Sequence, residues 1–198
     1  MFGRWRQIRA DRKQWAQAET LADLGQLMAA WLEGDMAWRA GAWPDLDPET
    51  NELVPVLARV NRAGFLTDDS QPASDETGAD GRHWWQRAAV SGFVTDEQML
   101  DALTRVADSY QLTILIREAG ARFPGPRVTV TRVDGEPYTR FGGHLTPEDL
   151  RHIWQGLSEP AVAELVDAWQ VTLVDPQFGR NDRLWTALNA ALELQIPA

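Results

Sequence analysis

The sequence predicts one α+β domain over residues 1–198, with a mainly antiparallel or mixed sheet of five to six short strands covered by about five helices. Segments with apolar residues at helical spacing alternate with short, β-branched runs. A hairpin interrupts that order, which argues against a regular doubly wound fold. No repeat or clean linker divides the chain. With 198 residues and 44% hydrophobic residues, it is long enough to bury a substantial core.

Start and stop signals predict where the helices lie. Thr20 with Asp23 resembles a capping box, and the apolar residues that follow indicate a helix ending near Gly34. Residues 53–63 form a second helix, which Gly64 ends. The later helices begin at Thr95 with Gln98, at Thr146 with Pro147, after Ser158 for a short helix, and at Asn181 or Asp182.

Short apolar or alternating runs predict the strands. The clearest pair is a hairpin, in which Asp134-Gly135 turns residues 128–133 into residues 136–141. Residues 68–82 are rich in Asp, Ser, Gly and Thr, so we interpret them as a polar loop. The remaining predicted strands are 65–67, 84–94, 112–116 and 169–174.

The charge distribution excludes some partners. The net charge is −10, and residues 1–13 hold five basic residues against Asp11 alone, which leaves 14 basic and 28 acidic residues elsewhere. Such an acidic body is repelled by phosphate backbones, so we do not expect it to bind nucleic acid. The basic arm at about 1–13 is interpreted as a solvated helix start. Contact with an anionic partner is the alternative.

Composition also narrows the chemistry. Without Cys, the chain has neither disulfides nor thiolate metal sites. The three His, at 83, 144 and 152, lack ligand spacing, so we expect no metal, and no motif calls for a cofactor. No apolar stretch is long enough to span a membrane and no secretory signal is evident. We therefore expect a cytoplasmic protein.

Three polar clusters stand out as candidates for a site. They are residues 67–72 after a strand, Gln86-Arg87 within a strand, and residues 175–182, where a Gly turn enters a helix. Loops on a rigid sheet commonly carry function, and Arg180 at a helix start suits an anion. The structural alternatives are an Asx or Ser turn, an edge strand facing water, and capping by Asn181 with a surface ion pair.

These clusters also resemble an uncharacterised family, a domain of unknown function found in actinobacterial genomes and mobile elements. The resemblance spans most of residues 15–188, although the closing motif usually carries Trp where this chain has Phe178. It favours a site over simple turns and implies no activity. The segments that carry it are Trp15, TLADLG at 20–25, NRAGFLTDDSQP at 61–72, QRAAVSGF at 86–93, DPQFGRND at 175–182 and Leu184-Trp185.

Two hypotheses of different class follow. In the first, four polar side chains line a cleft for a small polar ligand such as a nucleotide, because antiparallel pairing of neighbouring strands brings residues 67–71 near 84–88. In the second, the protein is an acidic interaction module without catalytic activity, such as an inhibitor, an immunity protein or a mobile-element accessory factor, that docks on a basic protein partner. The four side chains are Thr67, Ser70, Gln71 and Gln86.

Two charged residues complete the first hypothesis. Asp175 and Arg180 lie at the rim of the cleft if the C-terminal strand neighbours the first strand. If the protein is an enzyme, Asp68 or Asp175 is the candidate general base, but no motif indicates a nucleophile.

Overall fold

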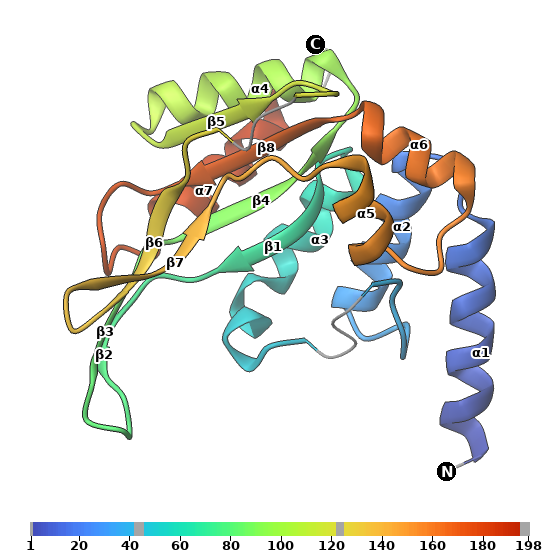
Figure 1. Ribbon diagram of the computed structural model, residues 1–198, viewed down its shortest axis with the longest axis horizontal. Coiled ribbons are helices and arrows are strands. Elements are labelled where there is room, and N and C mark those ends of the chain that lie inside the picture. Colours follow the sequence, from blue (N-terminus) through green and yellow to red (C-terminus); the bar gives the residue numbers. More distant parts are fainter. Residues whose placement is uncertain (1, 42–45, 122–124, 195–198) are drawn as a thin grey trace.

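The computed structural model describes residues 2–41, 46–121 and 125–194, and Figure 1 shows their arrangement. The described helices are α1 (Phe2–Gln17), α2 (Leu21–Leu32), the 3-10 helix η1 (Pro48–Leu53), α3 (Val54–Arg62), α4 (Glu97–Ser109), α5 (Pro147–Ile153), α6 (Glu159–Asp167) and α7 (Arg183–Glu193). The described strands are β1 (Leu66–Gln71), β2 (Ser74–Thr77), β3 (His83–Gln86), β4 (Ala89–Val94), β5 (Thr113–Arg117), β6 (Val128–Val133), β7 (Glu136–Phe141) and β8 (Trp169–Val174).

The strands form two antiparallel sheets, each with four strands. The first has the order β1-β4-β8-β5 and the second β2-β3-β6-β7. Helix α4 packs on β4, β5 and α7, while α2 packs on β1 and α3. The β2–β3 and β6–β7 hairpins extend together away from the helices, at the lower left of Figure 1. The α+β class is confirmed.

The predicted strand count was too low by two, because polar sequence concealed β2 and because one predicted strand is in fact two strands. Residues 68–82 were interpreted as a loop, but β1 continues to Gln71 and β2 follows at residues 74–77. Both are edge strands, so neither needs apolar residues on both faces. The predicted strand at 84–94 is also divided, since the chain crosses from the second sheet to the first at Arg87-Ala88.

Most predicted helix starts are confirmed at the level of individual hydrogen bonds. The Thr20 hydroxyl accepts from the Asp23 N–H at 3.1 Å and completes a capping box, and Thr146 does the same for α5. The hairpin turn has φ of 51° at Asp134 and 86° at Gly135, the positive values that a tight two-residue hairpin turn requires.

Two predicted caps were assigned to the wrong residue or role. Asp96, rather than Thr95, caps α4 by accepting from the Gln98 N–H. Asp182 stands at the start of α7 without a side-chain cap. The Asn181 side chain instead accepts from the Ala73 N–H and from the Trp185 indole N–H, and so connects the start of α7 to the segment between β1 and β2.

The basic arm forms the first turns of α1. Its basic side chains are exposed, whereas Asp11 and Trp15 are fully buried. The Asp11 carboxylate accepts from the Ala37 and Trp38 N–H groups at 2.7 and 3.1 Å, which fixes α1 to the segment after α2. No described helix is both long enough and apolar enough to cross a bilayer.

An irregularity in β1 shapes the edge of the first sheet. Thr67 pairs with Gly92 and Asp69 with Ser91, so Asp68 is an extra residue without a partner, which makes a β-bulge. A Cβ at Gly92 would lie 2.2 Å from the Leu66 carbonyl oxygen and 2.9 Å from the Thr67 Cα. The two strands therefore meet so closely that only glycine fits opposite the bulge.

We predict that Gly92→Ala lowers the melting temperature by several degrees, because overpacking against backbone atoms costs about 1–3 kcal/mol. Thermal unfolding followed by circular dichroism measures this change. The matched control is Gly3→Ala, where an added Cβ meets nothing within 4 Å. Equal melting temperatures for the Gly92 variant and the wild type would contradict the close approach of the two strands.

Candidate functional site

A cleft of about 820 Å³ opens beside the bulge of β1. The acidic residues of β1 line one side, and Trp31 and Arg39 come from α2 and the segment after it. Residues 46–50, including Asp47 and Glu49, contribute a further wall. The apolar lining includes Leu57, Phe141, Leu145 and Ile153.

The bulge places two consecutive carboxylates in the cleft. Side chains of a regular strand alternate between the faces of a sheet, but Asp68 and Asp69 both line this cleft. The strand is held at this point by Asn61, whose amide oxygen accepts from the Thr67 N–H at 2.9 Å. The Asn61 amide nitrogen donates to the Thr67 hydroxyl at 2.7 Å and to the Leu57 carbonyl at 2.8 Å.

Arg39 is the only Arg or Lys among the described residues that line the cleft. Its side chain is only 7% exposed, and its guanidinium carbon lies 4.9 Å from the centre of the Trp31 ring and 5.9 Å from that of Trp154. One of its nitrogens contacts the Met28 sulfur at 3.8 Å, while its Nε finds no hydrogen-bond partner among the described residues. A buried guanidinium so placed is a donor available to a ligand.

Burial and mutual repulsion shift the pKa values of these groups. Burial raises the pKa of Asp68, against the attraction of Arg39. Surrounding protein and the neighbouring Asp68 raise the pKa of Asp69 to about 6, although part of its side chain reaches the solvent of the cleft. Burial also lowers the pKa of Arg39 and raises that of Glu49, and the nearby Asp47 raises the latter further. Perturbed carboxylates within one cleft are typical of functional sites.

Three of the predicted ligand-binding residues, Thr67, Ser70 and Gln71, line the cleft. Thr67 is engaged by Asn61. The Gln71 amide donates to the Arg87 and Val130 carbonyls and accepts from the Thr131 hydroxyl, so its polar atoms join the two sheets. The Ser70 side chain, by contrast, forms no hydrogen bond to another described residue.

Gln86 lies outside the cleft lining but close to it. It pairs with Ser74 and Thr131 in the second sheet. The Gln86 side chain lowers the pKa of the Glu49 carboxyl, against the larger opposing effect of burial. Gln71 pairs with Ala89, which lies three residues after Gln86 in the chain.

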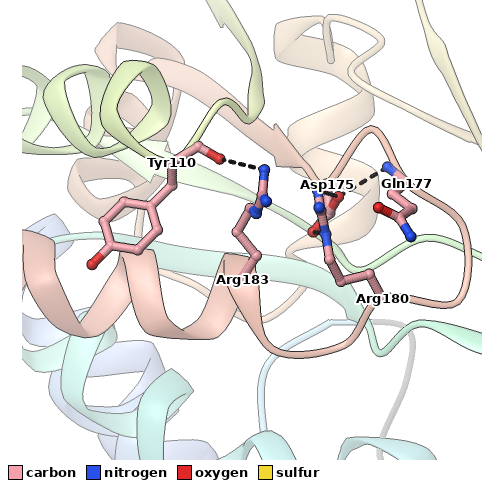
Figure 2. A network of polar contacts seen from close by, with 5 residues as sticks. All are labelled: Tyr110, Asp175, Gln177, Arg180 and Arg183. Carbon is pink, nitrogen blue, oxygen red and sulfur yellow. Dashed lines mark hydrogen bonds and ion pairs between the residues drawn. The ribbon is translucent and has the colours of Figure 1, made fainter.

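Asp175 and Arg180 form a separate structural unit. Arg180 makes a two-pronged ion pair with the fully buried Asp175, which also accepts from the Gln177 N–H at 2.9 Å (Figure 2). The arrangement takes up the Arg180 charge that we had considered for anion binding. Strand β4 lies between β8 and β1, so the condition for placing these residues at the rim is not met, and neither lines the cleft.

Phe178 and Gly179, in the segment 175–182, contact residues at the end of β3 in the second sheet. The Arg87 guanidinium lies 4.2 Å from the centre of the Phe178 ring, and the Gly179 N–H donates to the Gln86 carbonyl at 2.9 Å. The segment 175–182 therefore fastens the β3 end of the second sheet to the first.

Sequence reasoning missed the most informative residues of the cleft. Arg39 lies in a short segment between helices that carries no recognisable motif. Asp69 falls within the predicted cluster 67–72 but has no predicted role of its own, and nothing in the sequence marks Glu49 as a site residue. The available signal was an acidic pair directly after the predicted strand at 65–67, where charged side chains either end a strand or face a cavity.

The structure is an α+β fold with a cleft at the edge of a sheet, lined by charged and apolar side chains. The chain belongs to the family described as a domain of unknown function (DUF6919), whose model matches residues 10–195. This confirms the expectation of an uncharacterised family. The chain is also 27% identical, over 143 residues, to a probable methylenetetrahydrofolate reductase (NADH) from Oryza sativa subsp. japonica. That match covers 66% of this chain and 21% of the relative, so the chain spans about a fifth of the relative's length.

We predict that Arg180→Ala destabilises the protein by about 3 kcal/mol, because it leaves the buried Asp175 carboxylate without its charged partner. Urea unfolding measures the change. The control is Arg62→Ala, whose ion pair with Glu33 is exposed on both sides and contributes at most about 1 kcal/mol. Equal losses in the two variants would contradict the structural role of Asp175–Arg180.

A second prediction follows from the pKa of Asp69. The pKa of Asp69 is about 6 in the folded protein and 3.8 in the unfolded chain, so the folded protein binds the carboxyl proton more tightly. Ionisation of Asp69 therefore lowers the free energy of unfolding as the pH rises from 3.8 to about 6, and the loss persists at higher pH. We therefore expect Asp69→Asn to be more stable than the wild type at pH 7.5, with a smaller difference at pH 3.5. The control is Asp101→Asn, which removes an exposed carboxylate on α4. If Asp69→Asn destabilised the protein at pH 7.5, the folded structure would favour the ionised carboxylate, and this prediction would be contradicted.

Proposed function

We propose that this protein binds a small polar organic molecule in the cleft beside β1. The observation that carries the proposal is the buried Arg39 side chain, which shares that cleft with Asp68 and Asp69 and has an Nε without a partner among the described residues. A volume of about 820 Å³ lies within the range of roughly 300–1,000 Å³ that is common for ligand pockets.

The charge of the cleft refines the expected ligand. Asp47, Glu49, Asp68 and Asp69 outnumber Arg39, so the cavity carries negative charge at neutral pH. Phosphate groups would be repelled from such a cavity unless they met Arg39 alone. Ligands that carry hydrogen-bond donors or positive charge therefore suit the cleft better than the nucleotide that the sequence suggests.

The name of the rice protein supplies two further probes. That name mentions methylenetetrahydrofolate and NADH. Each of these two compounds is a small polar molecule with a flat ring system. Because this chain matches about a fifth of that protein, the reductase activity is not proposed for it. The ligand panel includes both molecules, and the phosphate groups of NADH are expected to weaken its binding to the acidic cleft.

The second sheet supports a different candidate function, that of an interaction module. Tyr138 and Trp85 are 64% and 38% exposed on the extended hairpins. Exposed aromatic side chains are enriched at protein interfaces. These residues do not line the cleft, so a partner on the hairpins and a ligand in the cleft would leave each other's contacts intact.

The test is a thermal-shift panel at pH 7.5 containing amino acids, nucleosides, sugars, methylenetetrahydrofolate and NADH. A ligand that binds only the folded state raises the melting temperature, by an amount that grows with its concentration. We expect at least one such ligand, and we expect Asp69→Asn to abolish its shift while Asp101→Asn retains it. A panel without any shift, or equal shifts in both variants, would refute the cleft as the binding site.

A further inference from the structure

Arg39 is buried, and no described residue provides a charged partner for its guanidinium. The guanidinium is held between Trp31 and Trp154 and makes its one described hydrogen bond to a thioether sulfur, a weak acceptor. No carboxylate of the described residues lies within 4.0 Å of its nitrogens. An unpaired buried donor is costly, and an anionic group bound in the cleft would provide the partner that Arg39 lacks.

The two carboxylates of the bulge, in contrast, lack a positively charged partner among the described residues. Asp68 and Asp69 are adjacent, they repel one another, and Arg39 attracts both without forming an ion pair. Positive charge placed between them would relieve the repulsion. The cleft thus holds an available cation and an available pair of anions that do not neutralise each other.

Singly charged ligands meet only half of this arrangement. An anion would pair with Arg39 but would face the carboxylates of Asp68 and Asp69. A cation would pair with those carboxylates but would leave Arg39 unpaired. A molecule that carries both charges a few ångströms apart satisfies both, and the α-amino carboxylate group is the common biological example.

The walls of the cleft suit the rest of such a molecule. Trp31, Leu57, Phe141, Leu145 and Ile153 contribute apolar surface. The cavity of about 820 Å³ is larger than an amino carboxylate group alone requires, so it leaves room for a bulky or aromatic substituent.

From this geometry we infer that the ligand is a zwitterion of the α-amino acid class with a bulky side chain, its carboxylate bound by Arg39 and its ammonium group by Asp68 and Asp69. The inference rests on the proposed function and specifies the chemistry of its ligand. Trp31, which supports the Arg39 guanidinium, acts as a positioning residue.

The decisive experiment uses the wild-type protein and varies the ligand. Isothermal titration calorimetry at pH 7.5 compares the twenty free amino acids and a set of zwitterionic dipeptides. The best binder is then compared with its C-terminal amide, which lacks the carboxylate, and with its N-acetyl form, which lacks the ammonium group. We expect each modified form to bind at least about tenfold more weakly, because each leaves a charge of the cleft without its partner.

Protein variants assign each charge to its partner. Arg39→Gln is expected to weaken binding of the free amino acid at least about tenfold without weakening binding of its amide. Asp69→Asn is expected to weaken binding of the free amino acid without weakening binding of its N-acetyl form, because the variant removes a negative charge that repels the anion. Arg105→Gln and Asp101→Asn, which alter exposed charges on α4, serve as matched controls and should bind as the wild type does. If Arg39→Gln fails to fold, the comparison of ligands on the wild type still decides.

The possible failures are distinguishable. Binding of NADH, methylenetetrahydrofolate or a nucleoside without binding of any zwitterion would overturn this inference and leave the proposed function standing. Equal affinities for a free amino acid and its amide or N-acetyl form would also overturn it. Binding of Mg²⁺ or Ca²⁺ in competition with the best amino acid would assign the carboxylates to a metal and contradict the ammonium contact. Absence of all binding would refute the proposed function as well.

Discussion

The pairing of β1 with β4 across Gly92 is the contact on which the cleft depends. It forces Asp68 out of register and presents two carboxylates in succession, where a regular strand would present one. The pairing is secured from the other side by Asn61, which holds both the backbone and the hydroxyl of Thr67. Asn61 is positioned in turn by the close approach of α2, because a Cβ at Gly25 would lie 2.2 Å from the Asn61 carbonyl oxygen.

The electrostatics of the cleft work against the stability of the empty protein. Burial disfavours the charged forms of Arg39 and Asp68, and repulsion from Asp68 further disfavours the charged form of Asp69. The Asp175–Arg180 pair is different, since each charge has its partner and a backbone N–H completes the set. Natural proteins commonly keep unfavourable charges where a ligand compensates them and satisfy the charges that only support the fold.

The sequence predicted well the elements whose signals are local. The capping box at Thr20, the N-cap at Thr146 and the Asp134-Gly135 hairpin turn depend on residues three or fewer positions apart, and all three are confirmed. It predicted poorly the elements decided by distant contacts. The strand character of residues 68–77 depends on pairing with β4 and β3, and neither an apolar run nor alternation marks it.

The candidate site shows the same division. The 67–71 segment was found because polar residues follow a strand, and it does line the cleft. Arg39 was not found, since its burial is created by Trp31 and by Trp154, which lies 115 positions away in the chain. Asp175 and Arg180 were interpreted as a ligand rim, because a buried ion pair and an exposed binding pair have the same sequence.

The most direct test of this account is the ionisation of Asp69 itself. Carboxyl ¹³C NMR titration of the unliganded protein, with Asp69→Asn used to assign the signal, measures its pKa without reference to any ligand. The account predicts a midpoint near 6, because protein atoms and Asp68 crowd the group while Arg39 does not pair with it. A midpoint at or below 3.8 would show that the carboxylate is solvated or paired in the free protein, and would contradict the view that the cleft is built around unsatisfied charge.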